Sequence, residues 1–327
     1  MNLFYTVNDA FVPQLGAAIC SVCENNREAE DIAFYIGSYN ISEANTAQLE
    51  ALAARYGRRI AFIPIGNLKE RLQFSFDTMG WNEIVLARLL VDQMIPEDVD
   101  RVLYLDGDTI VVGSLGELWE MDMGGCAVAA SIEPTVSKKR KRELGIGGMP
   151  YFNAGVLLID LKAWRSQNIA RRILDFYKAR QGRLFANDQD AINGALPGEI
   201  AVLPPKFNYS NILWNYPYRV LKRINSPAEY VSEEEFCKNY EDIRIIHYLG
   251  EDRPWRRGNT HRFSDRYHQY LSMTPWKDTP LEDGWTLYFK AYKAFWIILK
   301  PFPMLQYHIM DFLIPIVLKI RKKMRKP

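Results

Sequence analysis

The stretch VLYLDGDTIVV, residues 102–112, is a run of large apolar residues broken by two aspartates one residue apart. Alternate residues of a strand point to the same face, so extended geometry brings Asp106 and Asp108 together. Two close carboxylates repel each other unless a cation or a proton lies between them. A hard divalent cation such as Mg²⁺ or Mn²⁺ prefers oxygen ligands. The stretch therefore predicts a metal site at a strand end; the alternative is a turn at Gly107 with two solvated aspartates.

Strand patterns and helix patterns alternate along the chain on both sides of this stretch. Further strands are expected at 3–7, 32–38, 59–65, 151–164 and, as a short strand ending in a loop, 244–255. Helices are expected at 11–24, 42–56, 82–95, 168–180 and 185–196. This alternation predicts an α/β fold with a mostly parallel, doubly wound sheet covered on both faces. In such a sheet the ligand crevice lies at the carboxyl ends of the strands.

Charge is distributed unevenly over the 327 residues. From Thr286 to Pro327 there are nine Lys or Arg residues and one acid, Asp311, which gives this segment a charge of +8. Because the whole chain carries +2, the remainder carries −6. Such asymmetry indicates an anionic partner for the basic segment, either nucleic acid or a membrane surface. A second basic run, residues 138–142, is expected to be a solvated surface loop.

The cysteines and the N-terminus indicate the compartment. The four cysteines, Cys20, Cys23, Cys126 and Cys237, suggest no disulfide framework and suit a reducing environment. Cys20 and Cys23 form a lone CxxC within an apolar helical pattern, which favours core cysteines over a zinc site. The N-terminus lacks the basic region and apolar run of a signal peptide, so we expect a cytoplasmic protein.

Two classes of enzyme place Asp-x-Asp after an apolar strand. In haloacid dehalogenase-like phosphatases the first aspartate, here Asp106, is the nucleophile, and Thr or Val stands two residues after the second aspartate. Here that position is Ile110, and Thr109 falls one place early. The phosphatase motif also usually lies near the N-terminus, whereas three expected strands precede Asp106. The other class is the nucleotide-sugar glycosyltransferases.

Four blocks extend this comparison: VLYLDGDTIVVGSLGELW (102–119), YFNAGVLLIDLKAWR (151–165), NDQDAIN (187–193) and IIHYLGEDRPW (245–255). Together they resemble glycosyltransferase family 8, and most of all its bacterial galactosyl- and glucosyltransferases of lipopolysaccharide and surface-glycan synthesis. The resemblance runs from Asn2 to about Arg257. It implies a fold of the GT-A type and a retaining hexosyltransferase that moves a sugar from a UDP-sugar donor to a glycan or lipid-linked acceptor. A phosphohydrolase remains one alternative, and a protein that binds a UDP-sugar without turnover is another.

The resemblance implies a metal site and a phosphate loop. Asp106, Asp108 and His247 match the residues that hold Mn²⁺, with Mg²⁺ also possible, against the pyrophosphate of the donor. Without the resemblance, His247 would be read as a core histidine. Gly250 and Arg253 match the loop that closes over the phosphates. Arg253 stands where Lys is usual; it keeps the charge and adds a planar fork suited to phosphate.

The resemblance also assigns the remaining donor contacts. They are Thr6, Asn8, Asp9, Arg88, Gly107, Glu133, Asn153, Asp188 and Gln189. Asn8 replaces an acid that reads uracil, and Glu133 replaces an aspartate near the sugar, so base and sugar selectivity stay open. Asp188 and Gln189 are expected at the catalytic centre, where an amide suits electrostatic support of an oxocarbenium ion better than nucleophilic attack. The alternatives are a helix cap for Asp188 and a surface helix position for Arg88.

Residues 285–327 are expected to form a tail beyond a transferase domain at 1–284. Lysines, Asp311 and the prolines at 301, 303 and 315 interrupt the roughly twenty apolar residues that a spanning helix needs. We therefore expect short segments lying on the inner face of the plasma membrane, with residues 319–326 meeting anionic headgroups. The alternative is a helical lobe packed on the main domain. Nucleic acid is not the expected partner, because the aromatics of the tail stand among Ile, Leu and Val.

The acceptor is expected at loops 134–150 and 208–220.

Overall fold

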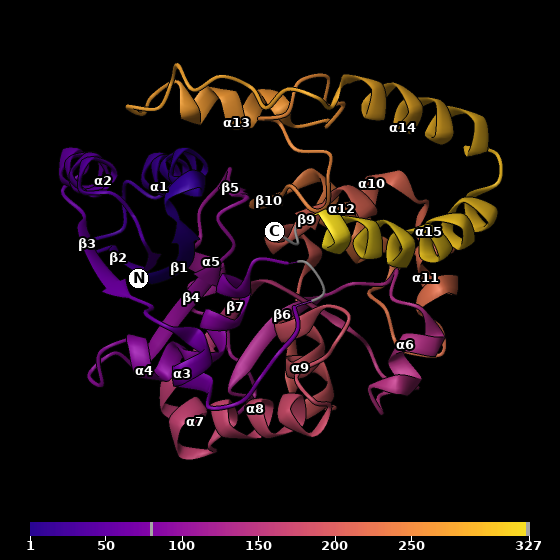
Figure 1. Cartoon of the computed structure of the whole chain (residues 1–327), viewed down its shortest axis with the longest axis horizontal. Helices are drawn as coiled ribbons and strands as arrows, with labels where there is room; N and C mark the ends of the chain where they lie inside the picture. Colours follow the sequence, from indigo (N-terminus) through magenta and orange to yellow (C-terminus); the bar gives the residue numbers. More distant parts are fainter. Residues whose placement is uncertain (79–80, 325–327) are drawn as a thin grey trace.

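The computed structural model describes residues 1–78 and 81–324, with side chains described up to residue 317. Within these residues a seven-stranded sheet forms the centre, in the order β3-β2-β1-β4-β7-β6-β8 (Figure 1). Its strands are β1 (Asn2–Asn8), β2 (Ala33–Tyr39), β3 (Arg59–Pro64), β4 (Arg101–Leu105), β6 (Val128–Ile132), β7 (Phe152–Asp160) and β8 (Ile200–Leu203). All neighbours pair in parallel except β7, which is antiparallel to both β4 and β6. The predicted mostly parallel α/β sheet is confirmed.

A small second sheet joins the large one at the aspartate pair. It consists of β5 (Thr109–Val111), β10 (Ile245–His247) and β9 (Tyr209–Ser210), with β10 antiparallel to β5 and parallel to β9. The strand expected at 102–112 is therefore two strands. The chain leaves the large sheet after Leu105, turns through Asp106, Gly107 and Asp108, and enters the small sheet at Thr109. The predicted strand end is present and so is a turn at Gly107, but the two solvated aspartates of the alternative are not, because Asp108 is buried.

Helices cover both faces of the large sheet, and each face has its own apolar core. One face packs against α1 (Val12–Asn25), α2 (Glu43–Arg55), α13 (Ser264–Leu271) and the small sheet. The other packs against α3 (Leu68–Leu72), η2 (Glu83–Leu90), α4 (Val91–Met94), α7 (Leu161–Ser166), α8 (Ile169–Ala179) and α9 (Asn187–Ala195). The other helical elements before the tail are η1 (Asp9–Phe11), α5 (Gly116–Trp119), α6 (Lys138–Glu143), η3 (Pro205–Phe207), α10 (Asn211–Asn215), α11 (Tyr218–Asn225) and α12 (Glu233–Glu241).

Three further local predictions differ from the structure. The strand expected at 151–164 ends at Asp160, and the residues after it form α7. The helix expected at 82–95 is a 3-10 helix, η2, followed by the short α4. The basic run 138–142 was predicted to be a solvated loop, and this is wrong: it forms α6, whose residue Lys141 is buried and donates a hydrogen bond of 3.0 Å to Asn225 Oδ1. The CxxC prediction is confirmed, because Cys20 and Cys23 are free thiols buried in α1.

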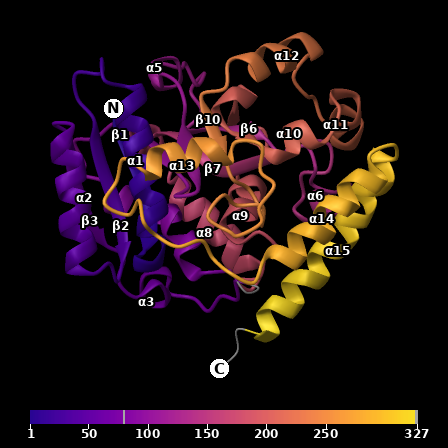
Figure 2. The same ribbon diagram turned by 90° about the horizontal axis from the view of Figure 1, so that it is seen from above.

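The C-terminal tail forms two helices, α14 (Thr286–Leu299) and α15 (Pro303–Met324), which lie antiparallel along one side of the molecule (Figure 2). One face of this hairpin packs on the body: Phe289 and Tyr307 are buried, and the Trp296 ring lies 5.4 Å from that of Tyr216. The short segments expected for the tail are thus two helices, and α15 continues through Pro315 over 22 residues. None of the described helices is long and apolar enough to cross a membrane.

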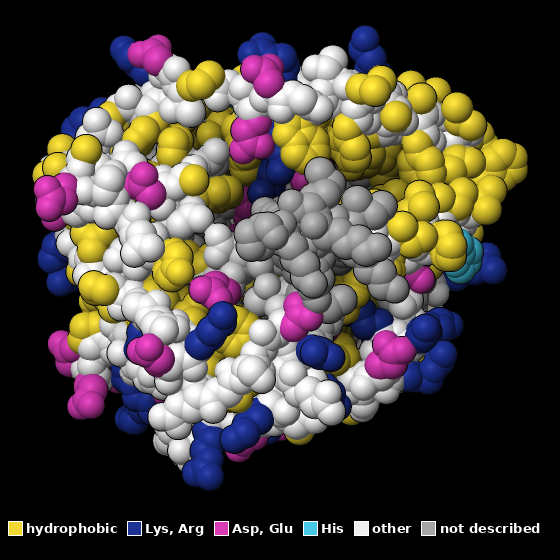
Figure 3. Space-filling model, in the orientation of Figure 1, with side chains coloured by type: hydrophobic (Ala, Val, Ile, Leu, Met, Phe, Trp, Pro, Cys, Tyr) yellow, Lys and Arg dark blue, Asp and Glu magenta, His cyan; other side chains and the backbone are white. Residues whose placement is uncertain are grey.

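The other face of the hairpin is apolar and exposed. Figure 3 shows hydrophobic side chains gathered over α14 and the turn into α15. The exposed large apolar residues of the two helices and their connection include Leu287, Ile297, Ile298, Phe302 and Phe312, each more than half exposed. The lysines of α14, at positions 290 and 293, are also exposed. The basic side chains predicted to meet headgroups, residues 319–326, lie outside the described side chains.

Candidate active site

The candidate site lies where the carboxyl ends of β1 and β4 meet the beginning of β7. Because β7 runs opposite to its neighbours, its first residues reach the edge of the sheet at which Asp106 follows β4. His247 ends β10 at this edge, paired with Thr109. The first turn of α9 brings Asp188 and Gln189 to the same place. The predicted site residues therefore gather at the edge of the sheet where a ligand crevice was expected.

Asp106, Asp108 and His247 converge at this edge. Their ligand atoms lie within 4.8 Å of one another, the one such group found among the described residues. His247 Nε2 is 3.4 Å from Asp108 Oδ1 and 3.9 Å from Asp106 Oδ2. Asp108 Oδ1 is buried and accepts no hydrogen bond from the described residues, so a cation would satisfy it. Two carboxylates and one imidazole form a donor set that suits Mn²⁺, and the residues fit the metal that the resemblance implies.

Arg253 forms an ion pair with the Asp108 carboxylate. Its Nη2 donates a hydrogen bond of 2.8 Å to Asp108 Oδ2, the oxygen opposite the one that faces His247. Burial alone would raise the pKa of Asp108, but Arg253 and His247 outweigh it and hold that pKa at about 2. Burial alone would lower the pKa of His247, but Asp108 and Asp106 outweigh it and raise that pKa above its usual value. Asp108 is therefore ionised at neutral pH, and its inward oxygen is available to a cation.

Arg88 joins the metal-site carboxylates to the start of α9. Its Nη2 is 2.9 Å from Asp106 Oδ1, its Nε is 2.9 Å from Asp188 Oδ2, and its Nη1 donates to the carbonyl of Ala154. The alternative of a surface position for Arg88 is wrong, because the side chain is only 6% exposed. Burial raises the pKa of Asp188 to about 6, and Arg88 limits that rise. Asp188 is thus an ion-paired carboxylate at neutral pH.

Glu133, Asn153 and Gln189 form a chain of hydrogen bonds beside the three metal-ligand candidates. Asn153 Nδ2 and Gln189 Nε2 donate to the same carboxylate oxygen of Glu133, at 2.8 and 3.1 Å. Gln189 Oε1 accepts the backbone N–H of Ala154 at 3.0 Å, which fixes the orientation of this amide. The amide NH₂ of Gln189 therefore faces Glu133 while its oxygen faces the backbone of β7.

The predicted nucleotide contacts lie at the end of β1 and in the loop after β10. Thr6 Oγ1 is 3.1 Å from the hydroxyl of Tyr104, and Asn8 is the last residue of β1. Asp9 Oδ1 accepts hydrogen bonds of 2.8 Å from the Ser42 N–H and the Asn45 side chain, so it anchors the start of α2. These hydrogen bonds lower the pKa of Asp9.

Two glycines lie where the site needs close approach or an unusual backbone. A side chain at Gly107 would press on Phe11 at about 3.0 Å. Gly250 adopts a positive φ of 83°, which favours glycine, and has open space around it. The predicted residues thus surround one edge of the sheet, although Asp9 faces α2 as well.

Several residues of the site were not predicted from the sequence. Tyr104 donates to Asp106 Oδ1 at 2.7 Å and links it to Thr6. Tyr151 lies 3.1 Å from Gln189 Nε2 and donates to Asp190 Oδ1 at 2.7 Å, and Arg140 pairs with the same carboxylate. The strand pattern around Tyr104 and Tyr151 indicates buried residues only, because a hydroxyl partner far along the chain leaves no local signal.

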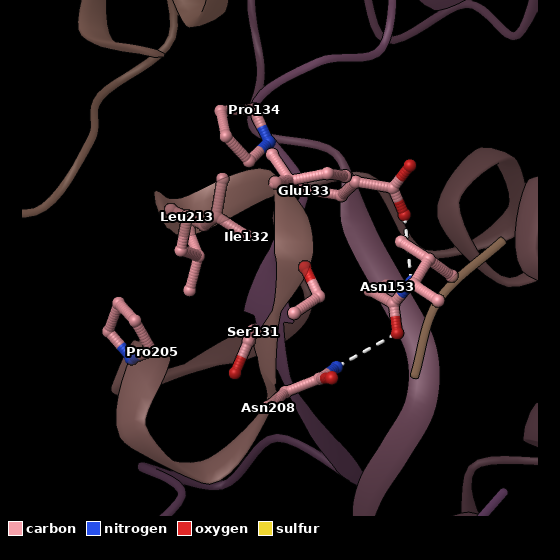
Figure 4. Close-up of a pocket in the computed structure, with 11 residues that line it drawn as sticks. Ser131, Ile132, Glu133, Pro134, Asn153, Pro205, Asn208 and Leu213 are labelled. Atoms are coloured by element: carbon pink, nitrogen blue, oxygen red, sulfur yellow. Dashed lines mark hydrogen bonds between the residues drawn. The ribbon is translucent and has the colours of Figure 1, made fainter. Parts of the chain in front are cut away.

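A small hollow opens beside these amides (Figure 4). Glu133, Asn153 and Asn208 line one wall, and the dashed lines show Asn153 bonded to both of the others. The opposite wall is apolar and includes Pro134, Pro205 and Leu213. The loops expected to hold the acceptor, 134–150 and 208–220, each contribute to this lining.

Comparison with known proteins decides the family. Residues 2–259 match the sequence profile of Glycosyl transferase family 8. The chain belongs to this family. The profile spans every site residue named above, from Thr6 to Arg253, and the resemblance carried by the four blocks is confirmed.

Proteins similar to this chain include two that are named as enzymes of lipopolysaccharide synthesis. The lipopolysaccharide 1,2-glucosyltransferase of Escherichia coli K12 is 27% identical over 289 residues, covering 87% of this chain and 81% of that protein. The lipopolysaccharide 1,3-galactosyltransferase of Salmonella typhimurium is 27% identical over 300 residues, covering 90% and 84%. General stress protein A of Bacillus subtilis is 24% identical and is covered over 94% of its length.

A solved structure agrees with the fold. The galactosyltransferase LgtC, in complex with donor and acceptor sugar analogues, superposes with a TM-score of 0.68 at 27% identity. The match covers 87% of this chain and 99% of LgtC. The α/β fold of the GT-A type predicted for this chain is confirmed, and the α14–α15 hairpin adds the expected C-terminal helical tail.

Proposed function

We propose that this protein is a metal-dependent, retaining glycosyltransferase that moves galactose or glucose from a UDP-sugar to a glycan or lipid-linked acceptor of the cell surface. The observation that carries the proposal is the convergence of Asp106, Asp108 and His247 beside the amide of Gln189. This arrangement offers a place for a diphosphate-bound cation and, next to it, a polar surface for a sugar. The names of the Escherichia coli and Salmonella typhimurium relatives support the class of product.

In this proposal Asp106, Asp108 and His247 hold Mn²⁺ or Mg²⁺, which supplies positive charge to offset the charge that develops on the departing UDP. Arg253 remains on the outer oxygen of Asp108 at 2.8 Å and keeps the inner oxygen turned toward the cation. Its Nε–H is buried and donates to no acceptor among the described residues, so this N–H is available to a phosphate oxygen. The planar guanidinium of an arginine can donate to the Asp108 carboxylate and to a phosphate at the same time, whereas the ammonium of a lysine is a single point charge.

The donor is proposed to bind across the edge of the sheet. Thr6, Asn8, Asp9 and Gly107 lie on the uridine side, and Gly250 lets the loop backbone approach the phosphates. On the sugar side, Glu133, Asn153 and Asp188 present polar atoms beside Gln189. Because Gln189 Oε1 already accepts the Ala154 N–H, its carbonyl is oriented by the backbone and is a poor nucleophile. We therefore assign Gln189 to positioning the sugar and to electrostatic support of positive charge at the anomeric carbon, with retention of configuration.

The hollow lined by Glu133, Asn153 and Pro134 is proposed as the entry for the acceptor. It borders the sugar side of the site directly, so an acceptor hydroxyl placed there meets the donor. Its mixed lining suits a sugar, which presents hydroxyls at its rim and C–H groups on its faces.

The tail, residues 285–327, is proposed to hold a domain of residues 1–284 on the inner face of the plasma membrane. Exposed apolar residues on α14 and α15 would enter the interface, and lysines such as Lys290 and Lys293 would meet anionic headgroups. An enzyme held there meets a lipid-linked acceptor in the plane of the membrane.

Release of UDP by the purified protein tests the proposal. We expect one UDP-sugar of a panel to be hydrolysed slowly with Mn²⁺ and not with chelator, and Asp106→Asn to abolish both metal binding and release. Family membership argues against the phosphohydrolase alternative, which predicts phosphate release, a covalent aspartyl-phosphate and no dependence on His247. Binding of a UDP-sugar without any turnover, even with acceptors supplied, would instead support a non-catalytic protein. Absence of both binding and release would refute the proposal.

A further inference from the structure

The imidazole of His247 is held on its far side by Asn208. His247 Nδ1 lies 2.8 Å from Asn208 Oδ1, and both side chains are buried. The contact follows from the small sheet: β9 pairs in parallel with β10, with Tyr209 opposite Ile246 and Ser210 opposite His247. Asn208 immediately precedes β9, so this pairing places its side chain against the ring.

The direction of this hydrogen bond is fixed by the neighbours of Asn208. The backbone N–H of Gly155 donates to Asn153 Oδ1 at 2.9 Å, so that atom must be the amide oxygen. Asn208 Nδ2 donates to the same oxygen at 2.8 Å. The remaining oxygen of Asn208 therefore faces His247, and because an amide oxygen only accepts, the Nδ1 of the ring must carry the hydrogen.

The consequence is that Nε2 of the neutral ring presents its lone pair to Asp106 and Asp108. A histidine that binds a metal commonly donates its other N–H to a fixed acceptor, which sets the tautomer and the orientation of the ring. Resting on the metal site proposed above, we propose that Asn208 is a positioning residue that presents Nε2 of His247 to the divalent cation. Asn153 fixes Asn208 in turn, so one buried chain of amides joins the metal side of the site to Glu133 on the sugar side.

The test combines metal affinity with nitrogen NMR of the full-length protein. Mn²⁺ binding is measured calorimetrically for the wild type, Asn208→Leu, Asn208→Asp and a control, Asn26→Leu. Asn26 is an equally buried asparagine whose oxygen accepts the Leu115 N–H at 2.7 Å, so its loss costs a comparable buried hydrogen bond outside the site. The tautomer is read from long-range proton–nitrogen spectra of the metal-free protein at alkaline pH, where the ring is neutral. The chain has four histidines, which keeps these spectra simple.

We expect Asn208→Leu to weaken Mn²⁺ binding roughly 10- to 100-fold and to change the tautomer signal of His247. Asn208→Asp, which keeps an oxygen toward the ring, should retain most of the affinity, and Asn26→Leu should bind as the wild type does. Wild-type spectra with the hydrogen on Nε2 would overturn the inference without any variant, and so would equal affinity in Asn208→Leu and the wild type. If the unmodified protein binds no Mn²⁺, the metal site of the proposed function fails and the inference fails with it. If His247→Ala abolishes binding and Asn208→Leu does not, only the inference fails.

Discussion

Gly155 lies directly against the imidazole ring of His247. A Cβ at Gly155 would overlap ring carbon Cε1 and come within 2.9 Å of Asp106 Oδ2. Because the ring is buried and hydrogen-bonded to Asn208, it cannot move away from an added side chain. Gly155 therefore packs directly against the candidate metal site, at a position where a side chain does not fit.

Gly155→Ala is expected to weaken Mn²⁺ binding at least tenfold and to lower the melting temperature, because overpacking a buried site costs about 1–3 kcal/mol. Isothermal titration and thermal unfolding measure the two effects. Gly148→Ala is the matched control, since a Cβ there meets nothing within 4 Å. Unchanged metal affinity in folded Gly155→Ala would show that the position of the His247 ring does not depend on the absence of a side chain at residue 155.

Arg88→Lys is expected to destabilise the protein by several kcal/mol, because a buried charge network then loses one of its partners. A lysine ammonium cannot reproduce the fork that reaches Asp106 and Asp188 at the same time. Urea unfolding measures this cost. Arg172→Lys is the control: it changes an arginine paired with Glu199 at the surface, where the expected loss is under about 1 kcal/mol. Equal losses in the two variants would contradict the assigned burial of the Arg88 network.

Lys141 is expected to make stability depend on pH in the alkaline range. Burial lowers its pKa from 10.5 to about 8 in the folded protein. Below pH 8 the lysine is charged in both states and the folded state bears the cost of burying that charge. Between these two pKa values the folded state releases the proton while the unfolded state keeps it. The free energy of unfolding therefore rises by about 1.4 kcal/mol for each unit of pH in this range.

Lys141→Met removes this contribution. The stability of the variant relative to the wild type should therefore fall as pH rises from 8 toward 10.5, as measured by urea unfolding at a series of pH values. Lys139→Met, on the exposed face of α6, should show a constant difference. A constant difference for Lys141→Met as well would mean that Lys141 is solvated when the protein is folded.

Replacing Ile297 and Ile298 together by serine is expected to weaken binding to vesicles that contain phosphatidylglycerol. Each side chain is more than 60% exposed, and burying one contributes about 1.5–3 kcal/mol, so the loss is roughly 10-fold or more. Vesicle sedimentation measures it. Val202→Ser, which changes an exposed apolar residue on β8, is the control. Equal sedimentation of the double variant and the wild type would place the membrane contact elsewhere or refute it.

The sequence predicted the elements that carry the site better than the contacts within it. Apolar runs located β1, β4, β7 and β10, and the aspartates after β4 indicated a cation, because these signals are local. The partner of His247 was not predictable, since Asn208 is 39 positions away and its side chain has no periodic signal. The burial of Lys141 was not predictable for the same reason: its basic neighbours resemble a solvated run, and its partner Asn225, in α11, is 84 positions away.

The reversed strand β7 has a consequence for variation within the family. The connection from β6 to β7, residues 133–151, both begins and ends at the edge that carries the candidate site, because the two strands are antiparallel neighbours. Insertions, deletions and substitutions in this connection change what faces the hollow while the strand pairing on either side keeps its register. The same catalytic edge can therefore be kept while the connection diverges, which offers evolution and engineering one contiguous segment in which to alter acceptor choice.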